Sequence, residues 1–168
     1  MKQQIIVSGI GGQGVLFLTR VIAQIAVNQG APVLTSETHG MAQRGGTVLS
    51  TIKIGHFSSP LIRTAQADLG IFLWEANLPV HRPLLKTAGK LLINTDKDGE
   101  GIRIDAAKIA RQLGNAVLLN LLLLGVAVNH KALICTAEEC EAAIKQLAPA
   151  RFTGQNLAAF HMGLSSST

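Results

Sequence analysis

Cysteines, aromatic rings and long hydrophobic runs are all scarce in this chain of 168 residues. The two cysteines, Cys135 and Cys140, form neither a C-x-x-C pair nor a set of four ligands, so the chain alone cannot hold an iron–sulfur cluster. Two free thiols in a reducing cytoplasm are expected. Tyrosine is absent and aromatic residues make up 4% of the chain, which leaves few side chains on which bases could stack. Nucleic acid is therefore not an expected partner.

Membrane and targeting signals are also lacking. The longest apolar stretch, 117–128, is interrupted by Asn120 and Gly125, and it falls short of the roughly 20 residues that a bilayer-spanning helix needs. Lys2 leads at once into an expected strand, without the pattern of a signal peptide. We therefore expect a cytoplasmic protein without membrane contact, whose apolar stretch is a buried and mostly helical segment.

The composition is rich in hydrophobic residues and poor in charged ones. Hydrophobic residues make up 48% and charged residues 15%, which favours a subunit that partners cover in part and that can self-associate when isolated. The length predicts one domain over residues 1–168. The formal charge of +5 is spread without a basic run. It suits anionic partners or substrates, and an inert basic surface is the alternative.

Expected strands and helices alternate along the chain. Apolar or β-branched runs predict strands at 4–8, 33–35, 47–54, 68–74, 90–94 and 102–104. Helical patterns cover 15–28, 75–85, 106–113, much of 117–128, 140–147 and 157–164, with Asp105 and a Thr136–Glu139 capping box as start signals. This alternation predicts an α/β, Rossmann-like three-layer domain with a mostly parallel sheet and helices on both faces.

The first expected strand runs into a cluster of glycines. Gly9, Gly11 and Gly14 satisfy the G-x-G-x-x-G spacing, which lets a backbone approach a phosphate or a neighbouring chain at a helix N-terminus. Glu37 stands about where a dinucleotide-binding domain keeps its acidic ribose ligand. Such a domain is larger, however, and nothing after Glu37 resembles one. Close helix–strand packing is the structural alternative.

Residues 37–46, Glu-Thr-His-Gly-Met-Ala-Gln-Arg-Gly-Gly, are too polar and too rich in glycine for an ordinary connection. His39, Gln43 and Arg44 form the best polar group in the chain, because an arginine can pair with a carboxylate or phosphate and a histidine can exchange a proton near neutral pH. A loop that only satisfies its own backbone at a subunit contact is the alternative. The other four histidines lack the spacing of metal ligands, so no metal site is expected.

Two further residues, Trp74 and Glu75, follow an expected buried strand. Open parallel sheets bind ligands at the carboxyl ends of their strands, so these side chains are candidates for lining a cleft, with packing as the alternative for Trp74.

Four motifs in order carry a family resemblance: Gly-Ile-Gly-Gly-Gln-Gly-Val from Gly9, Arg44-Gly45-Gly46, Asn-Leu-Leu-Leu-Leu-Gly from Asn120, and Asn-Leu-Ala-Ala-Phe-His-Met-Gly from Asn156. Together they resemble the gamma subunit or domain of 2-oxoacid:ferredoxin oxidoreductases, over essentially the whole chain. The sequence of residues 37–46 most resembles that of the beta-subunit type of indolepyruvate oxidoreductase.

The resemblance implies an accessory subunit of an enzyme that oxidatively decarboxylates a 2-oxoacid, such as indolepyruvate or pyruvate, to an acyl-CoA and passes electrons to ferredoxin. It implies that thiamine diphosphate, Mg and iron–sulfur clusters belong to partner subunits, that coenzyme A is a co-substrate, and that the chain has no catalytic residue and is inactive alone. The sequence agrees, since it has no Gly-Asp-Gly motif followed by paired asparagines for a diphosphate–magnesium site.

Two groups of site residues follow from this resemblance. Gly11, Gly12, Gln13 and Gly14 would form a ledge for the phosphates of coenzyme A or for a partner subunit, while His39, Gln43 and Arg44 would belong to an interface loop near the active site. The alternative function is a stand-alone Rossmann or flavodoxin-like module that binds a nucleotide or regulates another protein.

Overall fold

The computed structural model describes residues 1–39 and 45–167, and of His39 it describes only the backbone. A six-stranded sheet of order β2-β3-β1-β4-β5-β6 forms the centre. Its strands are β1 (Gln3–Ile10), β2 (Val33–His39), β3 (Thr47–Ile54), β4 (Ala67–Phe72), β5 (Leu85–Asn94) and β6 (Ile102–Ile104). The strands β1, β4, β5 and β6 pair in parallel, whereas β3 is antiparallel to β1 and β2. The predicted mostly parallel sheet is confirmed, with β3 reversed.

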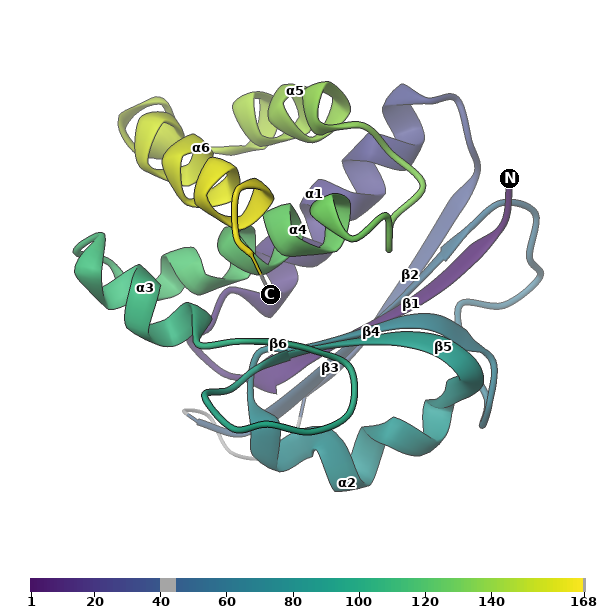
Figure 1. Cartoon of the computed structure of the whole chain (residues 1–168). Helices are drawn as coiled ribbons and strands as arrows, with labels where there is room; N and C mark the ends of the chain where they lie inside the picture. The colour runs from purple at the N-terminus through teal and green to yellow at the C-terminus, as the bar shows by residue number, and fades with distance from the viewer. Residues whose placement is uncertain (40–44, 168) are drawn as a thin grey trace.

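Helices cover both faces of the sheet unequally (Figure 1). One face carries α1 (Val15–Asn28), α3 (Ala106–Gln112), α4 (Leu119–Asn129), α5 (Ala137–Leu147) and α6 (Ala150–Leu164), of which α5 and α6 form an outer layer. A 3-10 turn, Ala116–Leu118, leads into α4. The other face carries the short α2 (Leu78–His81) between the 3-10 turns Glu75–Asn77 and Arg82–Leu84.

The core consists of two apolar clusters, one on each face of the sheet, and β1 contributes side chains to both. Ile5 and Val7 point into the large cluster beneath α1 and α4, whereas Ile6 belongs to a smaller cluster with Phe72 and Ile93 on the opposite face. Successive side chains of a strand alternate between faces, so a strand that is covered on both sides needs an almost continuous apolar run. The apolar run Ile5-Ile6-Val7 in the first strand fits this requirement.

Two glycines allow α4 and α6 to pack at close range. A Cβ atom built on Gly163 would collide with the carbonyl oxygen of Leu122 and lie 3.0 Å from the Cα of Gly125. A Cβ on Gly125 would in turn collide with the carbonyl oxygen of Phe160. The helix backbones therefore touch directly, which brings the outer layer against the core.

Several element boundaries differ from those expected. Residues 37–39, expected in a loop, continue β2 because they pair with 48–50 of β3. The expected helix 75–85 is divided into short turns in which Pro79 and Pro83 occupy starting positions, and Leu85 already belongs to β5. The last helix begins at Ala150 rather than at 157, because Pro149 serves as its N-cap.

Candidate functional site

The carboxyl ends of β1, β4, β5 and β6 meet along one edge of the sheet, which we call the carboxyl edge. The chain leaves β1 toward β2 and β3 on one side, and β4 lies against β1 on the other. In open α/β sheets, ligands bind in the crevice at such a switch point. The glycine loop, residues 9–14, begins in the last two residues of β1 and leads into α1 at this place.

The glycines of this loop have different tasks. Gly14 caps α1 with a φ of 76°, and Gly12 has a φ of 93°, a region that other residues rarely adopt. A Cβ on Gly14 would collide with Asn120, whose Nδ2 donates to the Gly14 carbonyl at 3.1 Å. Nothing lies within 4 Å of a Cβ on Gly12. Gly14 therefore serves close packing, while exposed Gly12 faces open space.

Gln13 braces the loop from within. Its Oε1 accepts the backbone N–H of Ile10 at 2.9 Å, and its Nε2 donates to the Leu73 carbonyl at 3.2 Å. Both ends of the amide are therefore occupied, and they tie the loop to the chain that follows β4. Gln13 therefore helps to fix the shape of the glycine loop.

The glycine loop touches the last residues of the polar segment 37–46. The backbone N–H of Gly11 donates to the Gly46 carbonyl at 3.0 Å, and Gly45, with a φ of 77°, also faces open space. The structure thus brings together two segments that sequence reasoning treated separately. Gln43 and Arg44 lie outside the described residues, and the backbone of His39 ends β2.

A buried polar network joins the end of β1, where the glycine loop begins, to the segment that contains α2. Asn77 donates through Nδ2 to the Gly9 carbonyl at 2.8 Å and to Ser8 Oγ at 3.0 Å. Ser8 Oγ lies 2.8 Å from Nδ1 of His81, and burial lowers the pKa of this histidine. Sequence reasoning missed this network, because its members are far apart in the chain and follow no motif.

A polar hollow of about 380 Å³ lies beside the glycine loop at the ends of β4, β5 and β6. Its lining includes Trp74, Glu75, Asn94, Asp96, Asp105 and Arg111. Asn94 donates to the Leu73 carbonyl at 3.0 Å and accepts the N–H of Ala107 at 2.9 Å. The Leu73 carbonyl thus joins this hollow to Gln13. Trp74 and Glu75, the candidates for lining a cleft, are both part of its lining.

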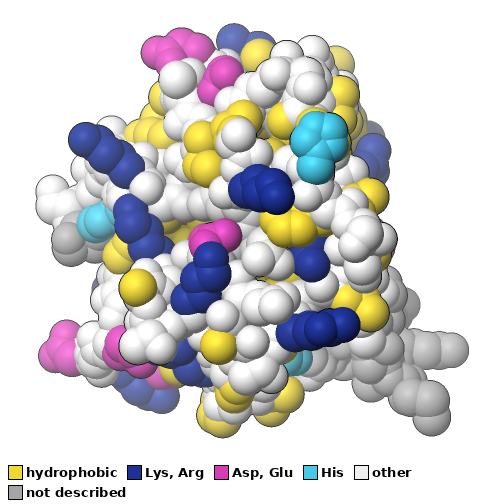
Figure 2. Space-filling view, turned by 90° about the vertical axis from the view of Figure 1, so that its right-hand side faces the viewer, with side chains coloured by type: hydrophobic (Ala, Val, Ile, Leu, Met, Phe, Trp, Pro, Cys, Tyr) yellow, Lys and Arg dark blue, Asp and Glu magenta, His cyan; other side chains and the backbone are white. Residues whose placement is uncertain are grey.

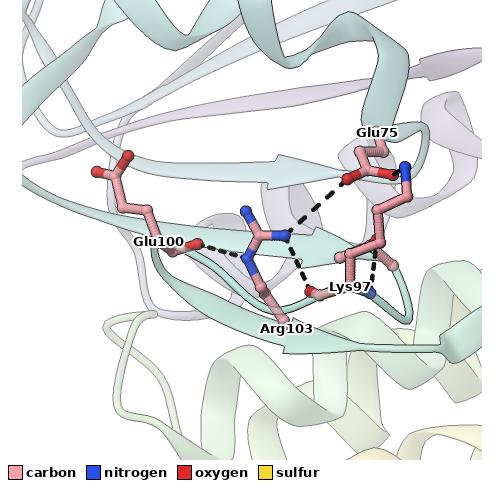
Figure 3. A network of polar contacts seen from close by, with 5 residues as sticks. Glu75, Lys97, Glu100 and Arg103 are labelled. Carbon is pink, nitrogen blue, oxygen red and sulfur yellow. Dashed lines mark hydrogen bonds and ion pairs between the residues drawn. The ribbon is translucent and has the colours of Figure 1, made fainter.

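Charged side chains fix one wall of the polar hollow (Figure 3). Lys97 Nζ lies 3.0 Å from Oε2 of Glu75, and Arg103 Nη1 lies 4.0 Å from Oε1. The hydrogen bond from Lys97 lowers the pKa of Glu75, with a smaller contribution from the Arg103 charge. Arg103 also donates through Nε to the Glu100 carbonyl at 2.9 Å. These contacts hold the 96–101 turn against the chain that follows β4.

On the other side of the glycine loop the surface is apolar. A hollow of about 370 Å³ lies between the loop, the start of α1 and Val117, and a second, of about 240 Å³, lies between Val117 and Phe152. Val117 and Phe152 are 43% and 38% exposed. We call this surface the apolar ledge; it consists of Ile10, Leu16, Phe17, Val117 and Phe152.

The sheet order argues against dinucleotide binding at the glycine loop. Glu37 lies on β2, and β3 separates β2 from β1. Two strand spacings place the two about 10 Å apart, whereas a dinucleotide fold keeps the acidic ribose ligand on the strand next to the glycines. Glu37 therefore does not have the position of a ribose ligand.

Metal and redox groups can be assessed on the part of the chain that the structure describes. It contains no group of three or more His, Cys, Asp or Glu side chains that could hold a metal ion. Cys135 and Cys140 are free thiols with sulfur atoms 3.5 Å apart. Their hydrogen bond and burial raise the pKa of Cys140. No helix in this part is both long enough and apolar enough to cross a membrane.

Residues 4–166 match the family described as pyruvate ferredoxin/flavodoxin oxidoreductase. The chain belongs to this family. One relative, indolepyruvate oxidoreductase subunit IorB of Archaeoglobus fulgidus, is 30% identical over 99% of this chain and 96% of its own length. The resemblance expected from the four motifs is thereby confirmed, and the chain is a gamma-type subunit of the 2-oxoacid:ferredoxin oxidoreductases.

Two crystal structures of gamma-type subunits share the fold. The gamma subunit of a keto/oxoacid ferredoxin oxidoreductase from Geobacter sulfurreducens is 26% identical, with a TM-score of 0.79 over 96% of this chain and 95% of that one. The pyruvate oxidoreductase subunit PORC from Thermotoga maritima is 27% identical, with a TM-score of 0.80 over 96% of this chain and 94% of that one. The predicted α/β class is confirmed.

Proposed function

We propose that this chain, as a single domain in the cytoplasm, is the accessory subunit of a thiamine-diphosphate-dependent oxidoreductase that converts indolepyruvate to an acyl-CoA and reduces ferredoxin. The named activity of the Archaeoglobus fulgidus relative supports the substrate. The chain offers two cysteines and no thiamine motif, which supports placing thiamine diphosphate, Mg and the iron–sulfur clusters in partner subunits.

Within that assembly, the apolar ledge is the surface of this chain that we propose as an interface with another subunit. Exposed apolar side chains beside an open glycine loop fit the dry centre of a protein interface, whereas the phosphates of coenzyme A need cations or several free N–H groups. The thiamine-binding subunit is therefore the proposed occupant of the ledge, and His39, Gln43 and Arg44 remain proposed members of the same interface.

A substitution on the ledge tests this proposal. Val117→Asp places a charge among apolar contacts, so we expect affinity for the co-expressed thiamine-binding subunit to fall about tenfold or more. Val80→Asp is the matched control, because Val80 is 69% exposed on the short α2 of the opposite face. Calorimetric titration of each purified variant with the partner measures the effect.

Two results would contradict the proposal. Equal affinities for Val117→Asp and Val80→Asp would remove the ledge from the interface. Tight binding of a nucleotide by the isolated, monodisperse chain would instead favour the stand-alone Rossmann or flavodoxin-like module.

A further inference from the structure

Positive charge gathers at the amino edge of the sheet, on the side opposite to the glycine loop. Figure 2 looks at this side, where dark blue Lys and Arg side chains outnumber the magenta acidic ones. We call the group the basic edge; it consists of Lys2, Lys53, Arg63, Lys86, Lys90 and Lys131. Asp68 lies among them, and Glu138 and Glu139 belong to the first turn of the outer helix α5.

The fold, not the sequence, brings these residues together. Lys53 lies opposite Gln4 in the pairing of β3 with β1, and the backbone N–H of Gln4 donates to Asp68 at 2.7 Å. Lys86 forms an ion pair with the other oxygen of Asp68 at 2.5 Å. Lys90 follows on β5 and donates to the carbonyls of His130 and Lys131 at 2.9 and 2.7 Å.

This edge carries most of the net charge of the protein. Its six cations stand against one carboxylate, Asp68, and Glu138 and Glu139 are the acidic residues of the neighbouring helix α5. Even with these two counted, the edge holds three of the five excess positive charges of the chain. A concentrated charge creates a field that attracts an oppositely charged partner, which a scattered charge does not.

The side chains around these cations indicate which class of partner the basic edge suits. The ammonium groups of Lys2 and Lys53 lie 5.4 and 5.1 Å from the centre of the Phe57 ring, so this ring is covered and offers no platform for a base to stack on. Five exposed cations outnumber the exposed apolar side chains Met1, Leu61 and Ile134. Permanent interfaces are more apolar than this, while charged ones steer transient encounters.

We propose that the basic edge docks an acidic protein transiently, on the side of the subunit opposite to the apolar ledge. This inference goes beyond the proposed function, since it needs neither the thiamine-binding subunit nor a particular 2-oxoacid. Arg63 and Lys131 are the cations to test, because both are exposed and neither takes part in an ion pair within the described part of the chain.

Poly-L-glutamate serves as the acidic polypeptide probe for the full chain. We expect the double variant Arg63→Gln with Lys131→Gln to raise the dissociation constant about fivefold at low salt, and we expect this difference to vanish at high salt because of screening. Arg20→Gln with Lys108→Gln is the control, since it removes the same charge from α1 and α3. It should change the constant less than about twofold.

Three results would overturn the proposal. The first is an equal weakening by both double variants. The second is tighter binding of duplex DNA or of anionic phosphatidylglycerol vesicles than of poly-L-glutamate through Arg63 and Lys131, which would assign the edge to another class of partner. The third is loss of poly-L-glutamate binding when the chain is assembled with its partner subunits, because the edge would then be a permanent contact. Retained binding in the assembly supports transient docking.

Discussion

Gly12 and Gly30 are both exposed, both have positive φ and both have open space around a Cβ position. They differ in place, since Gly12 lies at the carboxyl edge and Gly30 follows the far end of α1. Replacing either with valine adds backbone strain of about 1–2 kcal/mol, so we expect similar losses of melting temperature. Only Gly12→Val should also weaken assembly with the thiamine-binding subunit or raise the Michaelis constant for coenzyme A.

Melting curves, partner affinity and coenzyme A kinetics for both variants separate these effects. If Gly12→Val loses stability but assembles normally and uses coenzyme A normally, the glycine loop serves packing alone.

His81 predicts a pH dependence of stability. Because burial lowers the pKa of this histidine below its ordinary value of 6.5, the unfolded chain takes up a proton before the folded chain does. The contribution of His81 is therefore complete above about pH 6.5 and is lost as the pH falls from there toward the folded pKa.

The matched variant is His81→Gln, whose amide can donate to or accept from the Ser8 hydroxyl and does not titrate. Urea unfolding at about pH 7.5 and about pH 5.5 should show a smaller loss of unfolding free energy for the variant than for the parent chain. Identical losses would mean that His81 has the same pKa in both states.

At the scale of the elements, α6 offers an internal comparison of two glycines. Gly163 touches α4 directly, so Gly163→Ala should destabilise the protein by about 1–3 kcal/mol through overpacking. Gly154 lies in the same helix with nothing within 4 Å of a Cβ position, and Gly154→Ala should stabilise it by about 0.5–1 kcal/mol. Chemical denaturation of both variants measures the difference, and losses of similar size would contradict the direct backbone contact.

Local signals explain which elements could be predicted from the sequence. The bounds of α1 and β3 agree with expectation, and the side chain of Asp105 and the box of Thr136 and Glu139 cap their helices as expected. The reversed direction of β3 could not be predicted, because the periodicity of a strand carries no direction. The start of α6 was missed since Pro149 ends one helix and also begins the next.

The candidate site was predictable only in its local parts. Their residue type allows the positive φ of Gly12 and Gly14, but the contact of Gly11 with Gly46 and the bonds of Asn77 depend on strand order. The clustering of charged residues on the surface could not be predicted from the sequence either. The six cations of the basic edge are dispersed in the sequence and form no basic run, and only the order of β1, β3, β4 and β5 in the sheet places them on one side.

The whole molecule has two contrasting edges, one apolar beside the glycine loop and one basic at the opposite ends of the strands. Such a division suits a subunit that is held permanently at one edge and remains accessible at the other. For a subunit of this kind we expect the chemistry to come from the assembly. The purified chain should show no absorbance of an iron–sulfur cluster and should not reduce ferredoxin with any 2-oxoacid, whereas the co-expressed assembly should do so with indolepyruvate and coenzyme A. Ferredoxin reduction by the chain alone would show that the subunit carries a catalytic centre of its own.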